Sequence, residues 1–130
     1  MMIQFLSIMN KHILVVDDDP SILAIFEYTL QEVGYTSLLA HSGETALEFL
    51  VEGHHIDLVF LDVKMSGMSG IETFQEIHKK YPNLPIIMMT GYSLDELKDM
   101  FSRHIYGIIY KPFDMEEVLA VIHNVLQVPA

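Results

Sequence analysis

The chain alternates short apolar runs of strand length with longer segments in which apolar residues recur at helical spacing. The apolar runs are the predicted strands, at 13–17, 35–40, 58–61, 86–89 and 105–110. Parallel strands need crossover connections, and near-continuous apolar runs indicate burial on both faces of a sheet. The alternation therefore predicts an α/β fold with a doubly wound, five-stranded parallel sheet between helices.

Residues that typically begin or end helices flank the segments between the predicted strands. The predicted helices lie at 20–33, 43–52, 70–80, 94–103 and 115–126. Asp19 and Ser42 are suitable N-caps, Gly34 ends the first helix, and Ser93 with Glu96 forms a capping-box pattern. No linker or low-complexity tract interrupts the series. We expect one domain, at 11–127, preceded by an N-terminal extension at 1–10 that can be disordered, with Met9 as an alternative start, and followed by a tail at 128–130.

The composition limits the classes of partner. Asp and Glu number 18 against seven Lys and Arg, giving a formal net charge of -11. This balance argues against nucleic-acid binding through these residues, because Lys and Arg make most phosphate contacts, and it favours cations and basic partners. The chain has no cysteine and no apolar run of the roughly 20 residues that a membrane span needs. We therefore expect a cytoplasmic protein that does not associate with membranes.

Polar residues stand where the predicted strands end. Asp17 and Asp18 close the first strand, Asp62 the third, Thr90 the fourth and Lys111 the fifth. In an open parallel sheet, ligands bind outside the carboxyl ends of the strands. The sequence therefore predicts that these five residues converge on one edge of the sheet.

The chemistry of these residues indicates a cation and a phosphoryl group. Crowded carboxylates repel one another unless a cation lies among them, and Mg²⁺ prefers oxygen ligands. Asp18 and Asp62 could ligate Mg²⁺ directly, with Asp17 acting through water. Lys111 and Thr90 could then neutralise phosphoryl oxygens while the ionised Asp62 attacks phosphorus.

Each residue alone has a simpler interpretation. The run Asp17 to Asp19 could be a solvated turn with one helix cap, and Asp19 is assigned to that cap. An isolated Asp62, Thr90 or Lys111 would usually be a turn or surface residue. Their joint placement at successive strand ends favours a functional site.

Four motifs resemble the receiver domain of two-component response regulators, across residues 11–126. They are ILVVDDDP, DLVFLDVKMSGMSGIE, IIMMTGY and YKPFD, in that order. The resemblance implies a flavodoxin-like sheet in the order 2-1-3-4-5 with five helices. It also implies Asp62 as phosphoacceptor, Asp17, Asp18 and the backbone carbonyl of Lys64 as further parts of the metal site, and Thr90 and Lys111 as phosphoryl contacts.

The resemblance also implies partners. The phosphoryl donor would be a phosphohistidine on a sensor histidine kinase or a phosphotransfer protein. Phosphorylation would change an interaction surface on the fourth helix, fifth strand and fifth helix, which binds a downstream protein or a fused output domain. Phosphorylation could also promote a homodimer. The domain would catalyse only its own phosphotransfer and dephosphorylation, and would otherwise not be an enzyme.

Three positions depart from the family pattern or stand close to the site. Ser66 replaces the usual proline, which should loosen the backbone beside Lys64. Ile108 stands where receivers usually carry the Tyr or Phe that moves with the threonine, so switching by that route is in doubt. Tyr92, two residues beyond Thr90, is expected to obstruct the attacking water and prolong the phosphorylated state.

Two alternatives remain open. One is a magnesium-dependent phosphatase like the haloacid-dehalogenase family, because Asp17 and Asp19 fit its Asp-x-Asp motif, although the residues that follow do not continue the pattern. The other is that these residues are the receiver portion of a longer regulator with a DNA-binding or enzymatic output.

Overall fold

The computed structural model describes residues 11–91 and 106–127. Several predictions concern residues outside these ranges: the extension at 1–10, Tyr92, the helix at 94–103 with its cap, and the tail at 128–130. Among the described residues, no helix is both long enough and apolar enough to cross a membrane.

All five predicted strands form, with ends that differ by one or two residues from the predicted ones. They are β1 (His12–Val16), β2 (Thr36–Ala40), β3 (Leu58–Asp62), β4 (Ile86–Thr90) and β5 (Gly107–Tyr110). Four of the five predicted helices lie in the described ranges: α2 (Pro20–Val33), α3 (Gly43–Val51), α4 (Gly70–Lys80) and α6 (Met115–Leu126). The predicted order of strands and helices is therefore confirmed for this part of the chain.

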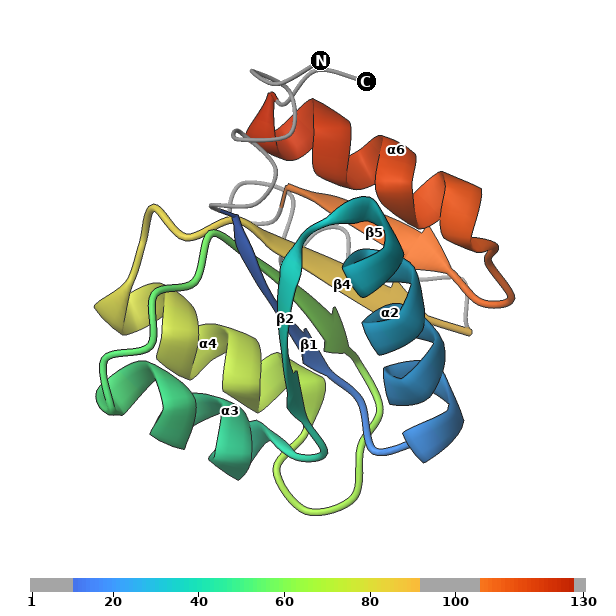
Figure 1. Cartoon of the computed structure of the whole chain (residues 1–130). Helices are drawn as coiled ribbons and strands as arrows, with labels where there is room; N and C mark the ends of the chain where they lie inside the picture. Colours follow the sequence, from blue (N-terminus) through green and yellow to red (C-terminus); the bar gives the residue numbers. More distant parts are fainter. Residues whose placement is uncertain (1–10, 92–105, 128–130) are drawn as a thin grey trace.

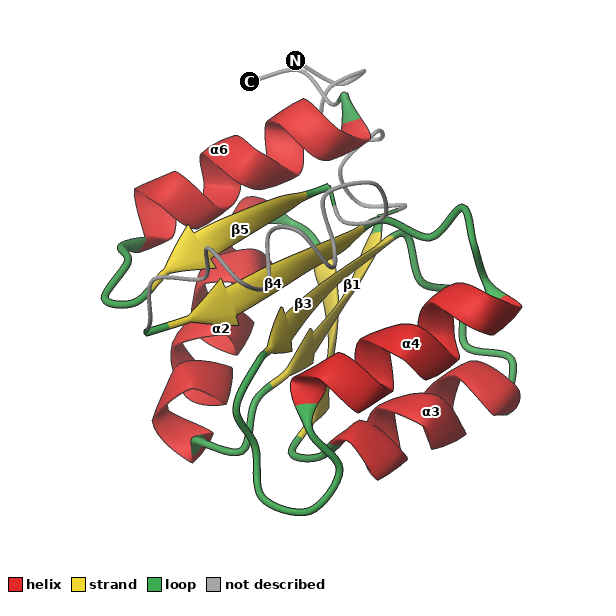
Figure 2. Cartoon of the chain, turned by 180° about the vertical axis from the view of Figure 1, so that it is seen from behind, coloured by secondary structure: helices red, strands yellow, loops and turns green. Residues whose placement is uncertain are grey.

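The strands form one parallel sheet in the order β2-β1-β3-β4-β5. Figure 1 shows α2 and α6 on one face of the sheet and α3 and α4 on the other. Figure 2, from behind, shows β1, β3, β4 and β5 pointing the same way, with β1 and β3 running into the loops that lead to α2 and α4. The predicted doubly wound fold and strand order are confirmed, and β5 is an edge strand in the described sheet.

Alternate residues of the central strands pack into two separate cores. Ile13 and Val15 of β1 face the core under α2 and α6, where Phe26 is fully buried. Leu14 and Val16 face the core under α3 and α4. Every residue of β3 and of β4 is buried, as expected for parallel strands with both faces covered.

The helix starts place the loops around the carboxyl ends of the strands. Asp19 Oδ1 accepts a hydrogen bond from the Ser21 N–H at 2.9 Å, which confirms it as the cap of α2. Helix α4 begins with a capping box that we did not predict, in which Ser69 and Glu72 each accept from the other's backbone N–H. These caps fix the direction in which α2 and α4 leave the sheet.

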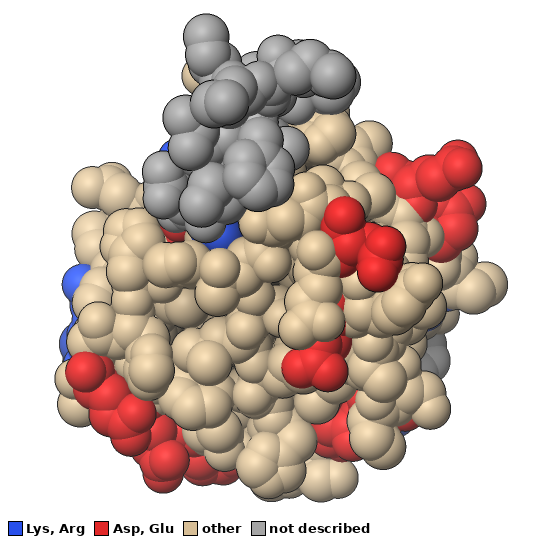
Figure 3. Space-filling model, viewed as in Figure 1, with Lys and Arg blue, Asp and Glu red and all other residues tan. Residues whose placement is uncertain are grey.

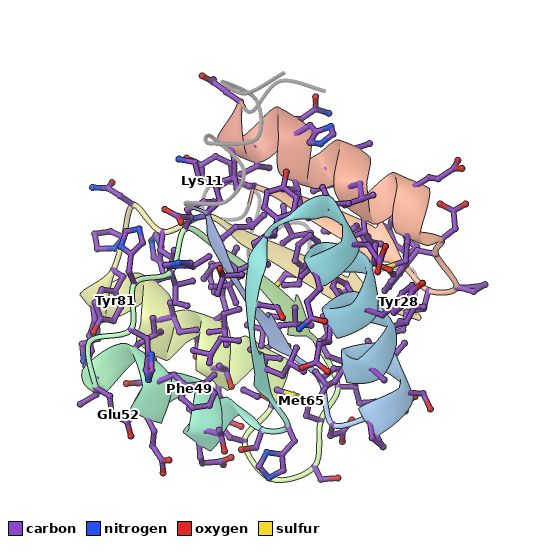
Figure 4. The ribbon with its side chains drawn as sticks, viewed as in Figure 1. Lys11, Tyr28, Phe49, Glu52, Met65 and Tyr81 are labelled. Atoms are coloured by element: carbon purple, nitrogen blue, oxygen red, sulfur yellow. The ribbon has the colours of Figure 1, made fainter. Side chains whose placement is uncertain are left out.

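Helices α3 and α4 are also tied together at their far ends. The hydroxyl of Tyr81 donates to the carbonyl oxygen of Leu50 at 3.3 Å. Figure 4 shows Tyr81 beside the end of α3, where Phe49 and Glu52 are labelled. This contact lies at the amino ends of the strands, so it leaves the loops at their carboxyl ends to form the candidate site.

Candidate metal and phosphoryl site

Three aspartates gather at the carboxyl ends of β1 and β3. Asp17 follows the last residue of β1, Asp18 comes next, and Asp62 is the last residue of β3. Each of the three offers a carboxylate oxygen, and these oxygens lie within 4.8 Å of one another. The structure therefore brings together the three predicted acidic residues, which lie up to 45 positions apart in the chain.

The side chain of Lys111 reaches this cluster from the loop after β5. Its Nζ atom lies 3.1 Å from Oδ2 of Asp17 and 3.3 Å from Oδ1 of Asp62. Asp17 is fully buried and Asp62 is 5% exposed, so water screens these ion pairs less than it screens pairs at the surface. Asp17 also accepts the Asp19 N–H through Oδ1 at 2.9 Å. The ammonium group and this N–H fix the buried carboxylate of Asp17.

Thr90 lies at the end of β4, between β3, which carries Asp62, and β5, which Lys111 follows. It is 2% exposed, and its carbonyl oxygen accepts the Lys111 N–H at 2.6 Å. This hydrogen bond holds the start of the loop after β5 beside the end of β4. The predicted phosphoryl contacts, Thr90 and Lys111, are therefore neighbours across adjacent strands.

The environment of Asp62 disfavours its charged form. Burial raises the pKa of Asp62 to about 6 from its ordinary value of 3.8, and the negative charge of Asp17 adds to this effect, whereas Lys111 opposes it. For Lys111, burial lowers the pKa, but the hydrogen bond and charge of Asp17, followed by those of Asp62, outweigh burial and raise it. A cation bound among the carboxylates would favour ionised Asp62.

The donor set fits a hard divalent cation. Three carboxylates face one ammonium group, so the cluster carries net negative charge when all its groups are ionised. The cluster offers oxygen ligands without histidine or cysteine, which matches the ligand preference of Mg²⁺. Asp17, Asp18 and Asp62 could therefore hold Mg²⁺. The role of the exposed Lys64 through its backbone carbonyl stays a prediction.

Two contacts of the loop between β3 and α4 were not predicted. The Ser66 N–H and hydroxyl both donate to Oδ2 of Asp18, at 3.1 and 3.4 Å. The Met68 N–H donates to Oε1 of Glu44, at the start of α3, at 3.1 Å. These contacts depend on the conformation of the loop. The sequence pattern of strands and helices therefore could not predict them.

Gly70 is a further residue whose role was missed. A Cβ atom at Gly70 would collide with the carbonyl oxygen of Asp62 and crowd the Cα atom of Val63. The Gly70 N–H donates to the Val63 carbonyl oxygen at 2.9 Å. Only a residue without a side chain lets the start of α4 approach the end of β3 this closely.

Asp19 stays outside the acidic cluster and caps α2. Ile108 of β5 packs at the edge of the core under α3 and α4, whereas Tyr110 of the same strand and Tyr106, just before it, are exposed. Over the wider surface, the face drawn in Figure 3 carries several separated acidic patches and few basic groups. This distribution agrees with the net charge of -11.

Comparisons with known proteins agree on one family. The family model of the response regulator receiver domain matches residues 13–123, which include every proposed site residue. The transcriptional regulatory protein ZraR of Escherichia coli (strain K12) is 37% identical over 118 residues, covering 90% of this chain and 26% of ZraR. The autoinducer 1 sensor kinase/phosphatase LuxN of Vibrio campbellii (strain ATCC BAA-1116) is 32% identical over 112 residues, covering 86% of this chain and 13% of LuxN.

A solved structure shows the same architecture. The response regulator protein TrrA from Thermotoga maritima, crystallised in complex with Mg²⁺ and BeF, superposes with a TM-score of 0.79 at 38% identity and covers 88% of this chain and 98% of its own. The chain spans about a quarter or less of the curated relatives named above. The sheet order, the acidic cluster and these matches lead to one conclusion: the chain belongs to the response regulator receiver domain family.

Proposed function

We propose that this domain is a phosphorylation-controlled signalling switch that accepts a phosphoryl group on Asp62 in the presence of Mg²⁺. The observation that carries the proposal is the cluster itself. The carboxylates of Asp17, Asp18 and Asp62 lie within 4.8 Å of one another, and Lys111 Nζ is 3.3 Å from the proposed nucleophile. A bound cation and Lys111 together would offset the charge of an incoming phosphoryl group.

The proposed donor is a phosphohistidine on a sensor histidine kinase or a phosphotransfer protein. A carboxylate oxygen of Asp62 attacks phosphorus and forms a phosphorus–oxygen bond while the phosphorus–nitrogen bond of the donor breaks. The electron pair of the broken bond stays on the imidazole, which takes up a proton. The product is an acyl phosphate on Asp62.

The residues around Asp62 have separate tasks in this transfer. Lys111 places an ammonium charge beside the phosphoryl oxygens, and the hydroxyl of Thr90, at the end of the neighbouring strand, can donate to one of them. When bound, Mg²⁺ would act as a Lewis acid that neutralises charge on phosphoryl oxygens. Burial of Asp62 and Asp17 limits the water around the reacting group.

The proposed output is a change in protein interaction. The surface would comprise the segment predicted as a helix at 94–103, which lies outside the described residues, together with β5 and α6. Tyr110 of β5 and Tyr106, just before this strand, are 43% and 62% exposed, and exposed aromatic residues are common at protein interfaces. The relatives include a transcriptional regulator and a sensor kinase. They support a fused output domain or a separate downstream protein as the partner that responds to phosphorylation.

We further propose that the domain turns over no separate substrate. The phosphatase alternative rests on Asp17 and Asp19 acting as an Asp-x-Asp pair. Asp19 instead accepts the Ser21 N–H as a helix cap and lies outside the acidic cluster. This placement favours the switch, in which the domain catalyses only its own phosphorylation and dephosphorylation.

Incubation with acetyl phosphate and Mg²⁺, followed by intact-mass analysis, tests the proposal. Wild type should gain the mass of one phosphoryl group, and Asp62→Asn should gain none. Asp19→Asn is a matched control, because asparagine is also a good N-cap and Asp19 is outside the cluster. Equal phosphorylation of wild type and Asp62→Asn would disprove the assignment of Asp62. Sustained release of phosphate from a small phosphate ester would instead support the phosphatase.

A further inference from the structure

The loop between β3 and α4 is attached to the metal site through Ser66. Both donors of Ser66, its backbone N–H and its hydroxyl, point to the same atom, Oδ2 of Asp18, at 3.1 and 3.4 Å. These two residues are 48 positions apart. The contact therefore joins the loop after β1 to the loop after β3 at the acidic cluster, of which Asp18 is a member.

Asp18 is the member of the acidic cluster whose carboxylate is least restrained by burial. Asp17 is fully buried and Asp62 nearly so, and both accept hydrogen bonds from Lys111. Asp18 is exposed, and an exposed carboxylate is free to rotate unless donors hold it. Two donors on Oδ2 restrict that rotation, while Oδ1 accepts neither of these hydrogen bonds.

The rest of the loop supports the position of Ser66. Met65 is buried and anchors the loop to the core beneath it; Figure 4 labels this side chain near the base of the molecule. On the other side of Ser66, the Met68 N–H donates to Glu44 at 3.1 Å. Ser66 thus lies between two anchored positions, so its donors are presented to Asp18 in a fixed direction.

We propose that Ser66 is a positioning residue for the metal ligand Asp18, and that its two donors raise the affinity of the site for Mg²⁺. The inference rests on the magnesium site of the proposed function. Hydrogen bonds to a ligating carboxylate orient it, and removing them typically weakens metal binding by about 10- to 100-fold. A proline at position 66 has neither an N–H nor a hydroxyl. Serine in this chain therefore provides an interaction that proline could not.

Three substitutions separate the two donors, with the dissociation constant for Mg²⁺ measured by isothermal titration calorimetry. Ser66→Pro removes both donors and should weaken binding by about 10-fold. Ser66→Ala keeps the backbone N–H and loses only the longer contact, so it should weaken binding by less than about 10-fold. Ser66→Thr keeps both donors and should bind like wild type. Ser21→Ala, at an exposed serine in the first turn of α2, is the control and should also bind like wild type.

A second readout needs no metal. In the metal-free protein, the Ser66 amide should exchange slowly with solvent, and Asp18→Ala should accelerate this exchange because the acceptor is gone. In the Asp18→Asn background, Ser66→Pro should weaken Mg²⁺ binding less than in wild type, because the charged acceptor is absent. Thermal unfolding of each metal-free variant establishes that it is folded.

The outcomes distinguish the inference from the function on which it rests. Absence of Mg²⁺ binding by wild type would overturn the magnesium site itself. If wild type binds Mg²⁺ and a folded Ser66→Pro binds it equally well, the site stands and the role of Ser66 is overturned. Equal losses in Ser66→Pro and Ser66→Thr would also overturn it, because threonine retains both donors.

Discussion

The Nζ atom of Lys111 lies 3.3 Å from Oδ1 of Asp62 and donates a hydrogen bond to it. The same ammonium group lies 3.1 Å from Asp17. Lys111 thus lowers the pKa of Asp62, against the larger effects of burial and of the Asp17 charge. Removal of either neighbouring charge, that of Asp17 or that of Lys111, should therefore shift the pKa of Asp62 in a definite direction.

The first prediction concerns Lys111→Met, which keeps much of the side-chain length and removes the charge. The pKa of Asp62 should rise above its value of about 6, because within the described part of the chain the effects that lower it come from Lys111. Phosphorylation by acetyl phosphate at pH 7 should fall by at least about 10-fold, since a positive charge beside the reacting group is lost. NMR titration of the Asp62 carboxyl carbon and intact-mass time courses measure the two effects.

Lys80→Met is the matched control, because Lys80 is an exposed residue at the end of α4. It should leave both the Asp62 titration and the rate unchanged. An unchanged or lowered Asp62 pKa in Lys111→Met would contradict the electrostatic account of the site.

The second prediction concerns stability as a function of pH without metal. The folded-state pKa of Asp62, about 6, lies above its ordinary value of 3.8, so the folded protein holds this proton more tightly than the unfolded chain. The resulting stabilisation is fully present below pH 3.8 and is lost as pH rises to about 6. The free energy of unfolding of wild type, relative to Asp62→Asn, should fall across this window by at most about 3 kcal/mol.

Urea denaturation at a series of pH values measures this difference, and the comparison with Asp62→Asn removes the contribution of the other carboxylates. Saturating Mg²⁺ should flatten the dependence, because a cation among the carboxylates favours ionised Asp62. A relative stability that rises between pH 4 and pH 6 would reverse the sign and contradict the raised pKa.

Much of the architecture was predictable because it follows from the periodic spacing of apolar residues along the chain. The apolar runs of the strands and the apolar spacing of the helices determine which faces are buried, and an apolar core lies on each side of the sheet. The convergence of Asp17, Asp62 and Lys111 followed from the parallel sheet, since its carboxyl ends share one edge. Strand ends were less certain: Asp62 and Thr90 are the last residues of their strands, whereas Asp17 falls just beyond β1.

The contacts that depend on loop conformation were not predictable. Ser66 was expected to loosen the backbone, yet its N–H and hydroxyl both bind Asp18. No periodic pattern relates these residues, because their contact depends on the path of a whole loop. The capping box of Ser69 and Glu72 is different, because its Ser-x-x-Glu spacing is readable in the chain and could have been recognised.

The third prediction tests the close approach of Gly70 to Asp62, the proposed phosphoacceptor. Gly70→Ala should destabilise the protein by about 1 to 3 kcal/mol, because the new Cβ atom would collide with the Asp62 carbonyl oxygen and crowd Val63. Displacement of the end of β3 should also slow phosphorylation of Asp62. Thermal or urea unfolding and the acetyl phosphate assay provide the measurements.

Gly107→Ala is the control for adding a Cβ atom elsewhere in the fold. A Cβ at Gly107 would lie 3.5 Å from Cδ1 of Ile87, an ordinary packing distance, so stability should change by less than about 1 kcal/mol. Equal effects of the two substitutions on stability would show that the close approach of α4 to β3 does not specifically exclude a side chain at position 70.

The fourth prediction concerns Tyr35, just before β2, whose ring packs in the core under α2 and α6. It is 3% exposed, and its hydroxyl has no hydrogen-bond partner among the residues that the structure describes. A buried hydroxyl without a partner costs free energy, so Tyr35→Phe should leave stability at pH 7 unchanged or raise it by about 1 kcal/mol. Tyr28→Phe, at a tyrosine that is 64% exposed, should have no such effect. Urea unfolding at pH 7 measures both variants.

The same burial predicts how the two variants differ in alkali. Burial raises the pKa of Tyr35 to about 12 from its ordinary value of 10.0. The folded state therefore holds the phenolic proton more tightly than the unfolded chain, and this stabilisation is present below pH 10.0 and lost as pH rises to about 12. Tyr35→Phe has no proton to lose at this position, so its advantage over wild type should grow across that window, by at most about 3 kcal/mol. A loss of stability in Tyr35→Phe at pH 7 would instead mean that the hydroxyl makes a favourable interaction in solution.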